Sequence, residues 1–283
     1  MTTTLLDLSK QRDLTLMSQL AGAILTEADA LQIPIFMAGA MARDLILTFG
    51  YGINTGRATT DVDWAMQVES WEQFVALKDA LIDTGSFSAH TKGHQLKYGQ
   101  NLSVDLVPFG GIQNDQGLIT WPPDNHTVMS VLGFHEAYQN TITVRLPGNV
   151  DIRVVSLASL ALLKILAWDE RHLIFPKKDA HDFALIARHY TDAGNQDRLY
   201  EEFSHLVDAP DFEYELAGAR MLGYDIGMTF DGKARTIAAN ILQRETEAQG
   251  RLAFISAMPM EAEEALLLVM HVVKGLNDSI AAR

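Results

Sequence analysis

The segment from Phe36 to Met66 constrains the fold of this chain more than any other part of it. An apolar run ends at Gly39-Ala40, and Met41 to Phe49 then carries apolar residues at helical spacing. After a loop with three glycines, residues 61–66 alternate polar and apolar side chains, as a half-buried strand does. This order predicts a strand, a tight turn, a helix, a loop and a second strand.

Two carboxylates lie close together at the start of that second strand. Because strand side chains alternate, Asp61 and Asp63 share one face, and their mutual repulsion favours a cation between them. Mg²⁺ is the natural candidate, since it prefers oxygen ligands and shares them with substrate phosphates. For so short a motif, the alternative is that one aspartate caps a turn and the other is solvated at a sheet edge. The turn at Gly39-Ala40 favours the first interpretation, because its backbone N–H groups and the following helix suit a phosphate.

These residues resemble the signature of the nucleotidyltransferase superfamily of the DNA polymerase beta type. That signature is a glycine turn, a spacer, an Asp-hydrophobic-Asp motif and a third carboxylate on a later strand. Here the third carboxylate is Asp105, within the run Leu102–Val107. The chain departs from the signature at Ala40, where glycine or serine is usual, and in its long spacer before Asp61. The resemblance implies that Asp61, Asp63 and Asp105 hold two Mg²⁺ ions and that the substrate is an NTP.

Within the superfamily, the chain is most similar to the AbiEii-like nucleotidyltransferases, which include toxins of toxin–antitoxin pairs. The similar segments are GAMARDL, RATTDVDWA, VDLVPFG, LLKILAW and KKDAHD. They span roughly the first two thirds of the chain. The resemblance implies that a lysine and an aspartate on successive helices belong to the active site, and Lys164 with Asp179 or Asp182 matches them.

The surroundings of Lys164 support a similar expectation. A lysine among so many apolar neighbours either extends along them to solvent or meets an anion. The next predicted helix carries Asp179 and Asp182 one turn apart. We expect Asp182 to face Lys164 and Asp179 to cap its helix.

The catalytic residues predicted in this way are Asp61, Asp63, Asp105, Lys164 and Asp182. Contacts to the NTP are assigned to the glycine turn, the loop before Asp61 and the second helix. The residues assigned to these contacts are Gly39, Ala40, Arg43, Arg57, Thr60, Lys178 and Asp179. Arg57 and Lys164 are expected to supply positive charge for the polyphosphate.

The rest of the first half predicts a small mixed sheet with packed helices, an α/β (α+β) arrangement. Helical spacing covers Leu5–Ala30 and Trp71–Leu81, the latter with Ser70 and Gln73 as a capping box. A hairpin signal joins His94–Tyr98 to Leu102–Val107 and brings Asp105 to the sheet. The segments read as turns are Pro108–Gly111 and Trp121–Asn125, and those read as further strands are Thr141–Leu146 and Val150–Val155.

The pattern becomes helical at Ser156 and remains so, with breaks expected near Gly223, Gly227, Gly232 and Gly250. A strong amphipathic helix covers Glu261–Leu276. We therefore expect a nucleotidyltransferase catalytic domain over residues 1–155. Residues 156–283 are expected to form a helical domain that completes the active site and contributes to acceptor binding.

Composition narrows the class of protein. The 283 residues are 48% hydrophobic and 20% charged, which is ordinary for a globular chain with an ample core. Without cysteine there is no disulfide, no zinc–thiolate site and no thiol nucleophile. The first residues lack a signal-peptide pattern and the longest apolar run is too short for a bilayer, so we expect a cytoplasmic protein without membrane contact.

The net charge of −14 bears on the acceptor. Such a surface repels a nucleic-acid backbone except at a local basic patch, and it suits a cationic small molecule such as an aminoglycoside. The AbiEii-like motifs instead suit a tRNA or protein acceptor and an antitoxin partner. P-loop, α/β-hydrolase and zincin motifs are absent. We expect transfer of NMP from an NTP to an acceptor, with a non-catalytic nucleotide-binding protein as the alternative class.

Overall fold

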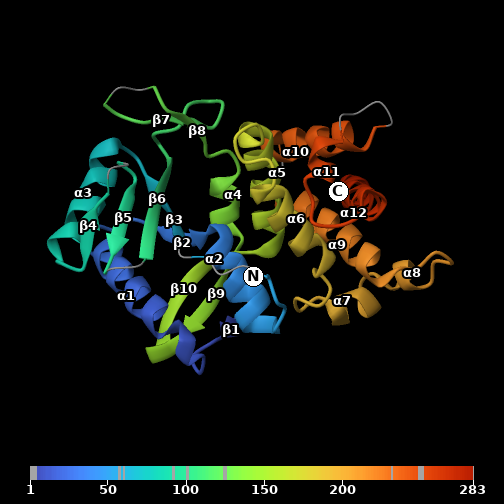
Figure 1. Cartoon of the computed structure of the whole chain (residues 1–283), viewed down its shortest axis with the longest axis horizontal. Helices are drawn as coiled ribbons and strands as arrows, with labels where there is room; N and C mark the ends of the chain where they lie inside the picture. The colour runs from blue at the N-terminus through green and yellow to red at the C-terminus, as the bar shows by residue number, and fades with distance from the viewer. Residues whose placement is uncertain are drawn as a thin grey trace. The chain divides into compact units, whose positions relative to one another are not determined.

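The computed structural model of the chain describes residues 5–56, 59, 61–90, 93–99, 102–123, 126–230, 232–247 and 252–282. Two of the predicted NTP contacts, Arg57 and Thr60, lie outside the described residues, as does the predicted helix break at Gly250. The chain divides into two compact units, Met1–Ser156 and Leu157–Arg283. Figure 1 shows a sheet with helices in the first unit and helices alone in the second.

The described part of the first unit contains one mixed sheet of eight strands, in the order β1-β9-β10-β2-β3-β6-β5-β4. The pairs β1–β9, β10–β2 and β3–β6 are parallel, and the remaining neighbours are antiparallel. Two further strands, β7 and β8, form a separate hairpin. The strand bounds are β1 (Leu5–Asp7), β2 (Ile35–Ala38), β3 (Asp61–Val68), β4 (Phe87–Ala89), β5 (Gln95–Tyr98), β6 (Leu102–Gly110), β7 (Leu118–Thr120), β8 (Val128–Ser130), β9 (Thr141–Leu146) and β10 (Val150–Val155).

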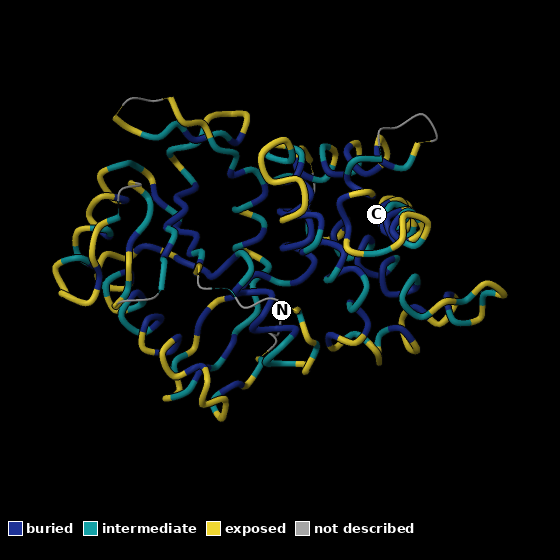
Figure 2. Tube along the Cα trace, in the orientation of Figure 1, coloured by how far each residue is buried: buried dark blue, intermediate teal, exposed yellow. Residues whose placement is uncertain are grey.

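Helices cover both faces of the large sheet. Figure 1 shows α1 and α3 on one side of it and α4 on the other. On the α4 side, Phe36 of β2 and Phe109 of β6 pack against Phe134 and Tyr138. Figure 2 shows buried residues running along the central strands. The helical segments of this unit are η1 (Arg12–Leu14), α1 (Thr15–Ala30), α2 (Gly39–Asp44), the π-helical η2 (Leu45–Gly50), α3 (Trp71–Asp83), α4 (Phe134–Gln139) and η3 (Pro147–Asn149).

The predicted fold class, a mixed sheet with packed helices followed by a helical region, is confirmed. The second unit contains α5 (Leu157–Arg171), α6 (Lys178–Arg188), α7 (Gln196–Glu201), α8 (Ser204–Val207), α9 (Tyr214–Thr229), α10 (Gly232–Thr246), α11 (Ala253–Ser256) and α12 (Ala262–Ala281). Within the described ranges, every helix is too short or too polar to cross a membrane.

Several local predictions are wrong at the chain's first residues and in β6. Residues 5–7 form β1, not helix, because they pair in parallel with β9, and the helix begins only at Thr15. Pro108–Gly110 belongs to β6, not to a turn. The backbone N–H of Leu106 donates to the His94 carbonyl just before β5. Because N–H groups alternate along a strand, an N–H at position 108 would point to the same side, but β5 pairs with β6 only as far as Asp105. Proline is therefore tolerated there, since no strand needs its missing donor.

The predicted capping box of α3 is not formed as expected, because Gln73 binds a different backbone N–H group. The helix follows Ser70 as expected, but the Gln73 side chain accepts its hydrogen bond from the backbone N–H of Glu69, at 2.8 Å, and not from Ser70. Ser70 itself makes no capping hydrogen bond to the helix backbone.

Two of the predicted helix breaks are also wrong, because their glycines serve helix packing. Gly223 and Gly227 lie inside α9, where added Cβ atoms would stand 2.0 Å from the Val272 carbonyl oxygen and 1.8 Å from Ser279 Oγ. Gly275 of α12 is placed against α9 in the same way. Glycine is needed here because the two backbones touch. Gly232, in contrast, has φ +64° and does begin a new helix.

Candidate functional site

The register of two parallel strands brings the predicted carboxylates together. Asp63 of β3 lies directly opposite Asp105 of β6, and Asp61 lies opposite Ser103. Paired residues on neighbouring strands point to the same face, so the three aspartates share one face of the sheet. Asp61 is exposed and the other two are half-buried. The alternate residues of the two strands face the opposite, buried side: Val62, Trp64, Val104 and Leu106.

The glycine turn meets this face at Asp63. Strand β2 runs antiparallel to β3 with Ala38 opposite Asp63, and Gly39 follows with φ +69°. A Cβ atom on Gly39 would stand 1.8 Å from Asp63 Oδ2. The position therefore requires glycine twice, for its left-handed backbone and for the close approach of the carboxylate. Ala40 lies in the first turn of α2.

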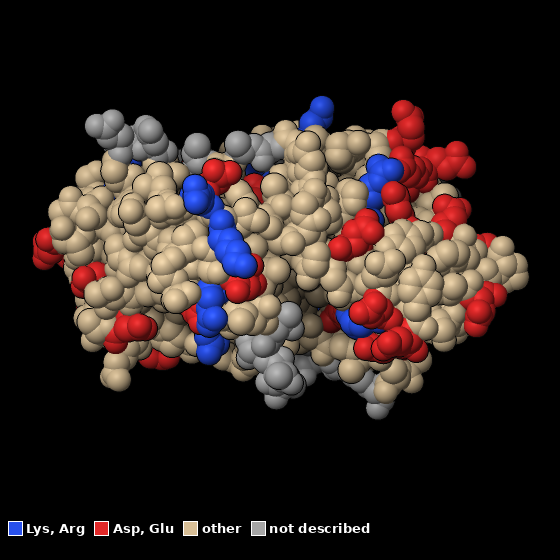
Figure 3. Space-filling model, turned by 90° about the horizontal axis from the view of Figure 1, so that it is seen from below, with Lys and Arg blue, Asp and Glu red and all other residues tan. Residues whose placement is uncertain are grey.

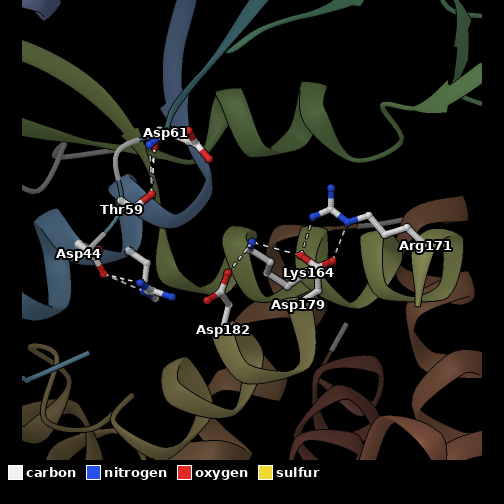
Figure 4. Close-up of polar contacts among 8 residues, drawn as sticks. Asp44, Thr59, Asp61, Lys164, Arg171, Asp179 and Asp182 are labelled. Carbon is white, nitrogen blue, oxygen red and sulfur yellow. Dashed lines mark hydrogen bonds and ion pairs between the residues drawn. The ribbon is translucent and has the colours of Figure 1, made fainter. Parts of the chain in front are cut away.

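Two polar neighbours support the other aspartates. The side-chain amide of Gln95, opposite Asp105 on β5, donates to Asp105 Oδ1 at 2.7 Å. The backbone N–H of Asp61 donates to Thr59 Oγ1 at 3.3 Å, as Figure 4 shows. Gln95 was not predicted as a site residue. Its position in the predicted hairpin, where it can lie opposite the third carboxylate, is the signal that could have identified it.

The carboxylate face fits a hard cation in its donor chemistry. Asp63 and Asp105 are side by side, and carboxylate oxygens are the ligands that Mg²⁺ prefers. Neither Asp61 nor Asp105 forms an ion pair with any residue that the structure describes. No three His, Asp or Glu side chains of the described ranges are gathered around one point as metal ligands. The described aspartates thus offer carboxylate oxygens on one face of the sheet, but they do not surround a single point.

Arg43, a predicted NTP contact, is buried in the first unit. Its guanidinium donates to Asp44 Oδ1 from Nε at 2.9 Å and from Nη2 at 2.6 Å. Only 2% of Arg43 is exposed. The Arg43 charge is therefore paired with the buried Asp44 carboxylate.

The second unit contains a compact ionic cluster, shown in Figure 4, which consists of Lys164, Arg171, Asp179 and Asp182. Lys164 Nζ lies 2.6 Å from Asp182 Oδ2 and 3.2 Å from Asp179 Oδ1. Arg171 donates to both oxygens of Asp179, each at 2.7 Å. The expected pair of Lys164 and Asp182 is therefore present, and Lys164 does not extend to solvent. Asp179 does not cap α6, because its oxygens accept hydrogen bonds from Lys164 and Arg171.

The cluster balances two buried carboxylates with two cations. Burial opposes ionisation of Asp179, but the hydrogen bonds from Arg171 and the charges of Lys164 and Arg171 hold its pKa below the ordinary value. Arg171 was not predicted. It lies seven residues after Lys164, two turns along the same face of α5, and this spacing is the signal that could have revealed it. Lys178, a predicted NTP contact, is exposed at the start of α6.

The surface charge differs between the units on the face shown in Figure 3. Lys and Arg side chains form a narrow stripe over the first unit, and Asp and Glu side chains are frequent over the second. Both observations agree with a chain that carries 36 acidic and 22 basic residues.

Comparison with solved structures finds nucleotidyltransferases at low similarity. The antibiotic-resistance factor ANT(2″)-Ia, solved with adenylyl-2″-tobramycin, is 16% identical over 68% of this chain and 98% of its own, with a TM-score of 0.40. An antigenic nucleotidyltransferase-like protein from Paracoccidioides brasiliensis is 14% identical over 70% of this chain and 93% of its own, with a TM-score of 0.41. A CCA-adding enzyme in its apo form II is 14% identical over 88% of this chain and 65% of its own, with a TM-score of 0.33.

These identities and TM-scores are too low to assign a family, an activity or a substrate to the chain. No protein-family model matches it, and no curated protein does.

Proposed function

We propose that this chain is a metal-dependent nucleotidyltransferase that transfers a nucleoside monophosphate from an NTP to an acceptor and releases pyrophosphate. The observation that carries the proposal is the register of β3 and β6, which sets Asp63 directly opposite Asp105 with Asp61 on the same face. Asp61 and Asp105 form no ion pair with a described residue, and a cation on the face that they share with Asp63 would relieve the repulsion among the carboxylates. Gly39 brings the glycine turn into contact with Asp63 on the same face.

The residues of this face have separate roles in the proposed reaction. Asp61, Asp63 and Asp105 would hold Mg²⁺, which supplies charge to bind the triphosphate and to stabilise the leaving pyrophosphate. Asp105 accepts the proton of the acceptor hydroxyl as its oxygen forms a bond to the α-phosphorus. The bond from the α-phosphorus to the bridging oxygen breaks, and that oxygen leaves with pyrophosphate. Gly39 and Ala40 offer backbone N–H groups to the β and γ phosphates.

We propose that the remaining charge for the polyphosphate comes from Arg57 and Lys178, with Thr60 as a further contact. Asp179 is fully buried and accepts hydrogen bonds from Lys164 and Arg171, which disfavours it as an NTP contact. Lys178 is the exposed lysine of α6, whereas Lys164 is buried and already neutralised by two carboxylates. The exposure of Lys178 supports it for direct contact, and in this proposal Lys164 acts by holding together the helices α5 and α6. Arg43 is bound to Asp44, which disfavours it as a phosphate contact.

For the acceptor we propose a hydroxyl of a tRNA or a protein, with the chain acting as the toxin of a cytoplasmic toxin–antitoxin pair. The support is the resemblance of its motifs to the AbiEii-like proteins. The net charge of −14 favours a second candidate, a cationic small molecule of the aminoglycoside class. A nucleotide-binding protein without chemistry is the third.

One experiment separates these candidates. The full chain is incubated with each α-³²P-labelled NTP, Mg²⁺ and either tRNA, a protein extract or an aminoglycoside, while pyrophosphate is measured. We expect label in the macromolecular fraction together with stoichiometric pyrophosphate. Label in the aminoglycoside selects the second candidate, and Mg²⁺-dependent NTP binding by calorimetry without pyrophosphate release selects the third. No NTP binding with or without Mg²⁺ overturns the proposal.

A further inference from the structure

The connection between α5 and α6 exposes three consecutive apolar side chains. Leu173, Ile174 and Phe175, here called the apolar tip, are 90%, 74% and 52% exposed. Single exposed apolar residues are common on protein surfaces, but a contiguous group is typical of an interaction site. Lys177 follows the tip and is also exposed.

The tip is held in place by contacts on both sides of it. The Trp168 indole N–H donates to the Pro176 carbonyl at 3.2 Å, and the Trp168 ring stacks on His172. The Arg171 carbonyl accepts hydrogen bonds from the backbone N–H groups of Ile174 and Phe175. These contacts fix the segment before any partner binds, so little conformational entropy is lost on docking.

A complementary surface lies on α12 of the same unit. Glu263, Leu267 and Met270 are exposed at a spacing of four and three residues, which places them on one face of the helix. The acidic end of this face is Glu263. An apolar tip followed by a lysine thus matches an apolar stripe preceded by a glutamate.

We propose that a second copy of this chain occupies the tip, with the apolar tip of each copy docked on the α12 stripe of the other. One tip alone is small beside the roughly 1,200–2,000 Å² of a stable interface. A two-fold arrangement makes the same contact twice and closes the assembly as a dimer. Lys177 of one copy then lies near Glu263 of the other.

Other occupants fit the observations less well. The two most exposed tip residues are aliphatic, whereas nucleic-acid interfaces are polar and strongly basic. A net charge of −14 opposes an anionic lipid surface, and stable membrane anchoring requires a second signal in addition to a few apolar side chains.

The test is sedimentation equilibrium of the full chain over a wide range of concentration. We expect a monomer–dimer equilibrium in the parent, and a dissociation constant raised roughly tenfold or more in Leu173→Ser/Ile174→Ser, since central apolar anchors dominate interfaces. The matched control is Leu16→Ser on α1, a position that is 50% exposed, which should leave the constant unchanged. Circular dichroism and Tm confirm that each variant folds as the parent does.

A charge exchange tests the pairing itself. Lys177→Glu and Glu263→Lys should each weaken self-association by about fivefold, and an equimolar mixture of the two should form a heterodimer through the pair of opposite charges. Lys97→Glu, at an exposed lysine of β5, is the control. A parent that is monomeric at all concentrations overturns the proposal, as does a dimer insensitive to the tip variants or a mixture without recovery.

Discussion

The two units hold their carboxylates in opposite ways. On the sheet, Asp61 and Asp105 lie on an accessible face, and neither is paired with a cation among the described residues. In the helical unit, Asp179 and Asp182 are almost completely buried, and each lies within ion-pair distance of Lys164. Asp61 and Asp105 thus have no cationic partner among the described residues, whereas Asp179 and Asp182 share Lys164.

This difference separates function from stability. The mutual repulsion of carboxylates on one face costs folding free energy, and in the proposed function a cation and the substrate bind there. The buried carboxylates of α6 are paired with the Lys164 and Arg171 side chains of α5. Removing one partner leaves a buried charge that is neither paired nor hydrated. Substitutions in the first group should affect turnover, and substitutions in the second should affect stability first.

The largest expected effect is on turnover, from Asp63→Ala. Loss of this carboxylate should reduce pyrophosphate release below detection, because Asp63 lies directly opposite Asp105 and on the same face as Asp61. The Tm should stay the same or rise as repulsion is relieved. Asp29→Ala, at an exposed position of α1, is the control. Full turnover in Asp63→Ala would end the proposed function.

The next effect is on stability, from Lys164→Met. It leaves Asp182 buried without its cation, which should destabilise the unit by about 3–5 kcal/mol in urea unfolding. The protein that still folds should lose at least tenfold in kcat/KM for NTP if α6 presents Lys178 to the substrate. Arginine at 164 should restore activity only partly, since its planar fork differs from a point charge.

Two further variants sharpen this result. Lys164→Met/Asp182→Leu should recover part of the stability, because the buried pair is replaced by apolar side chains. Lys178→Met should leave stability unchanged, since Lys178 is exposed. Equal stability of Lys164→Met and the parent would show that the buried ion pairs do not hold this unit together.

A smaller loss of stability is expected from Gly39→Ala. The φ of +69° should cost about 1–3 kcal/mol with any side chain present. The added Cβ must also displace the Asp63 carboxylate, so turnover should fall with stability. Gly22→Ala is the matched control, because a Cβ there meets nothing within 4 Å, and in mid-helix alanine should stabilise. The measurements are urea unfolding curves and turnover of both variants. Equal losses in the two variants would contradict the prediction.

The smallest effect concerns pH and Asp179. Its folded-state pKa is depressed below the ordinary value of 3.8, so its contribution to stability is present above that pH and is lost as pH falls through the folded value. Urea unfolding between about pH 5 and 2, followed by far-ultraviolet circular dichroism, should show this loss. Asp179→Asn should flatten the dependence, whereas Asp29→Asn should not. An unchanged slope in Asp179→Asn would assign acid sensitivity to other groups.

The sequence by itself determined the local parts of this protein. Alternation placed Asp61 and Asp63 on one strand face, the hairpin signal placed β5 beside β6, and apolar spacing identified α5, α6 and α12. These features depend on side chains within one element, so a short window contains the information. Pairing of Lys164 with Asp182 was also foreseeable, since a buried cation requires an anion.

The tertiary structure decided what depends on contacts between distant segments. Leu5–Asp7 is a strand only because β9, more than a hundred residues later, offers it a partner. Gly223 and Gly227 continue α9 because α12 packs against their bare backbone. The hydrogen bonds that Gln95, Arg171 and Asp179 make are established only where β5, α5 and α6 lie beside their neighbours. A hydrogen bond or a close approach between segments has no local pattern, because its geometry exists only after the chain has folded.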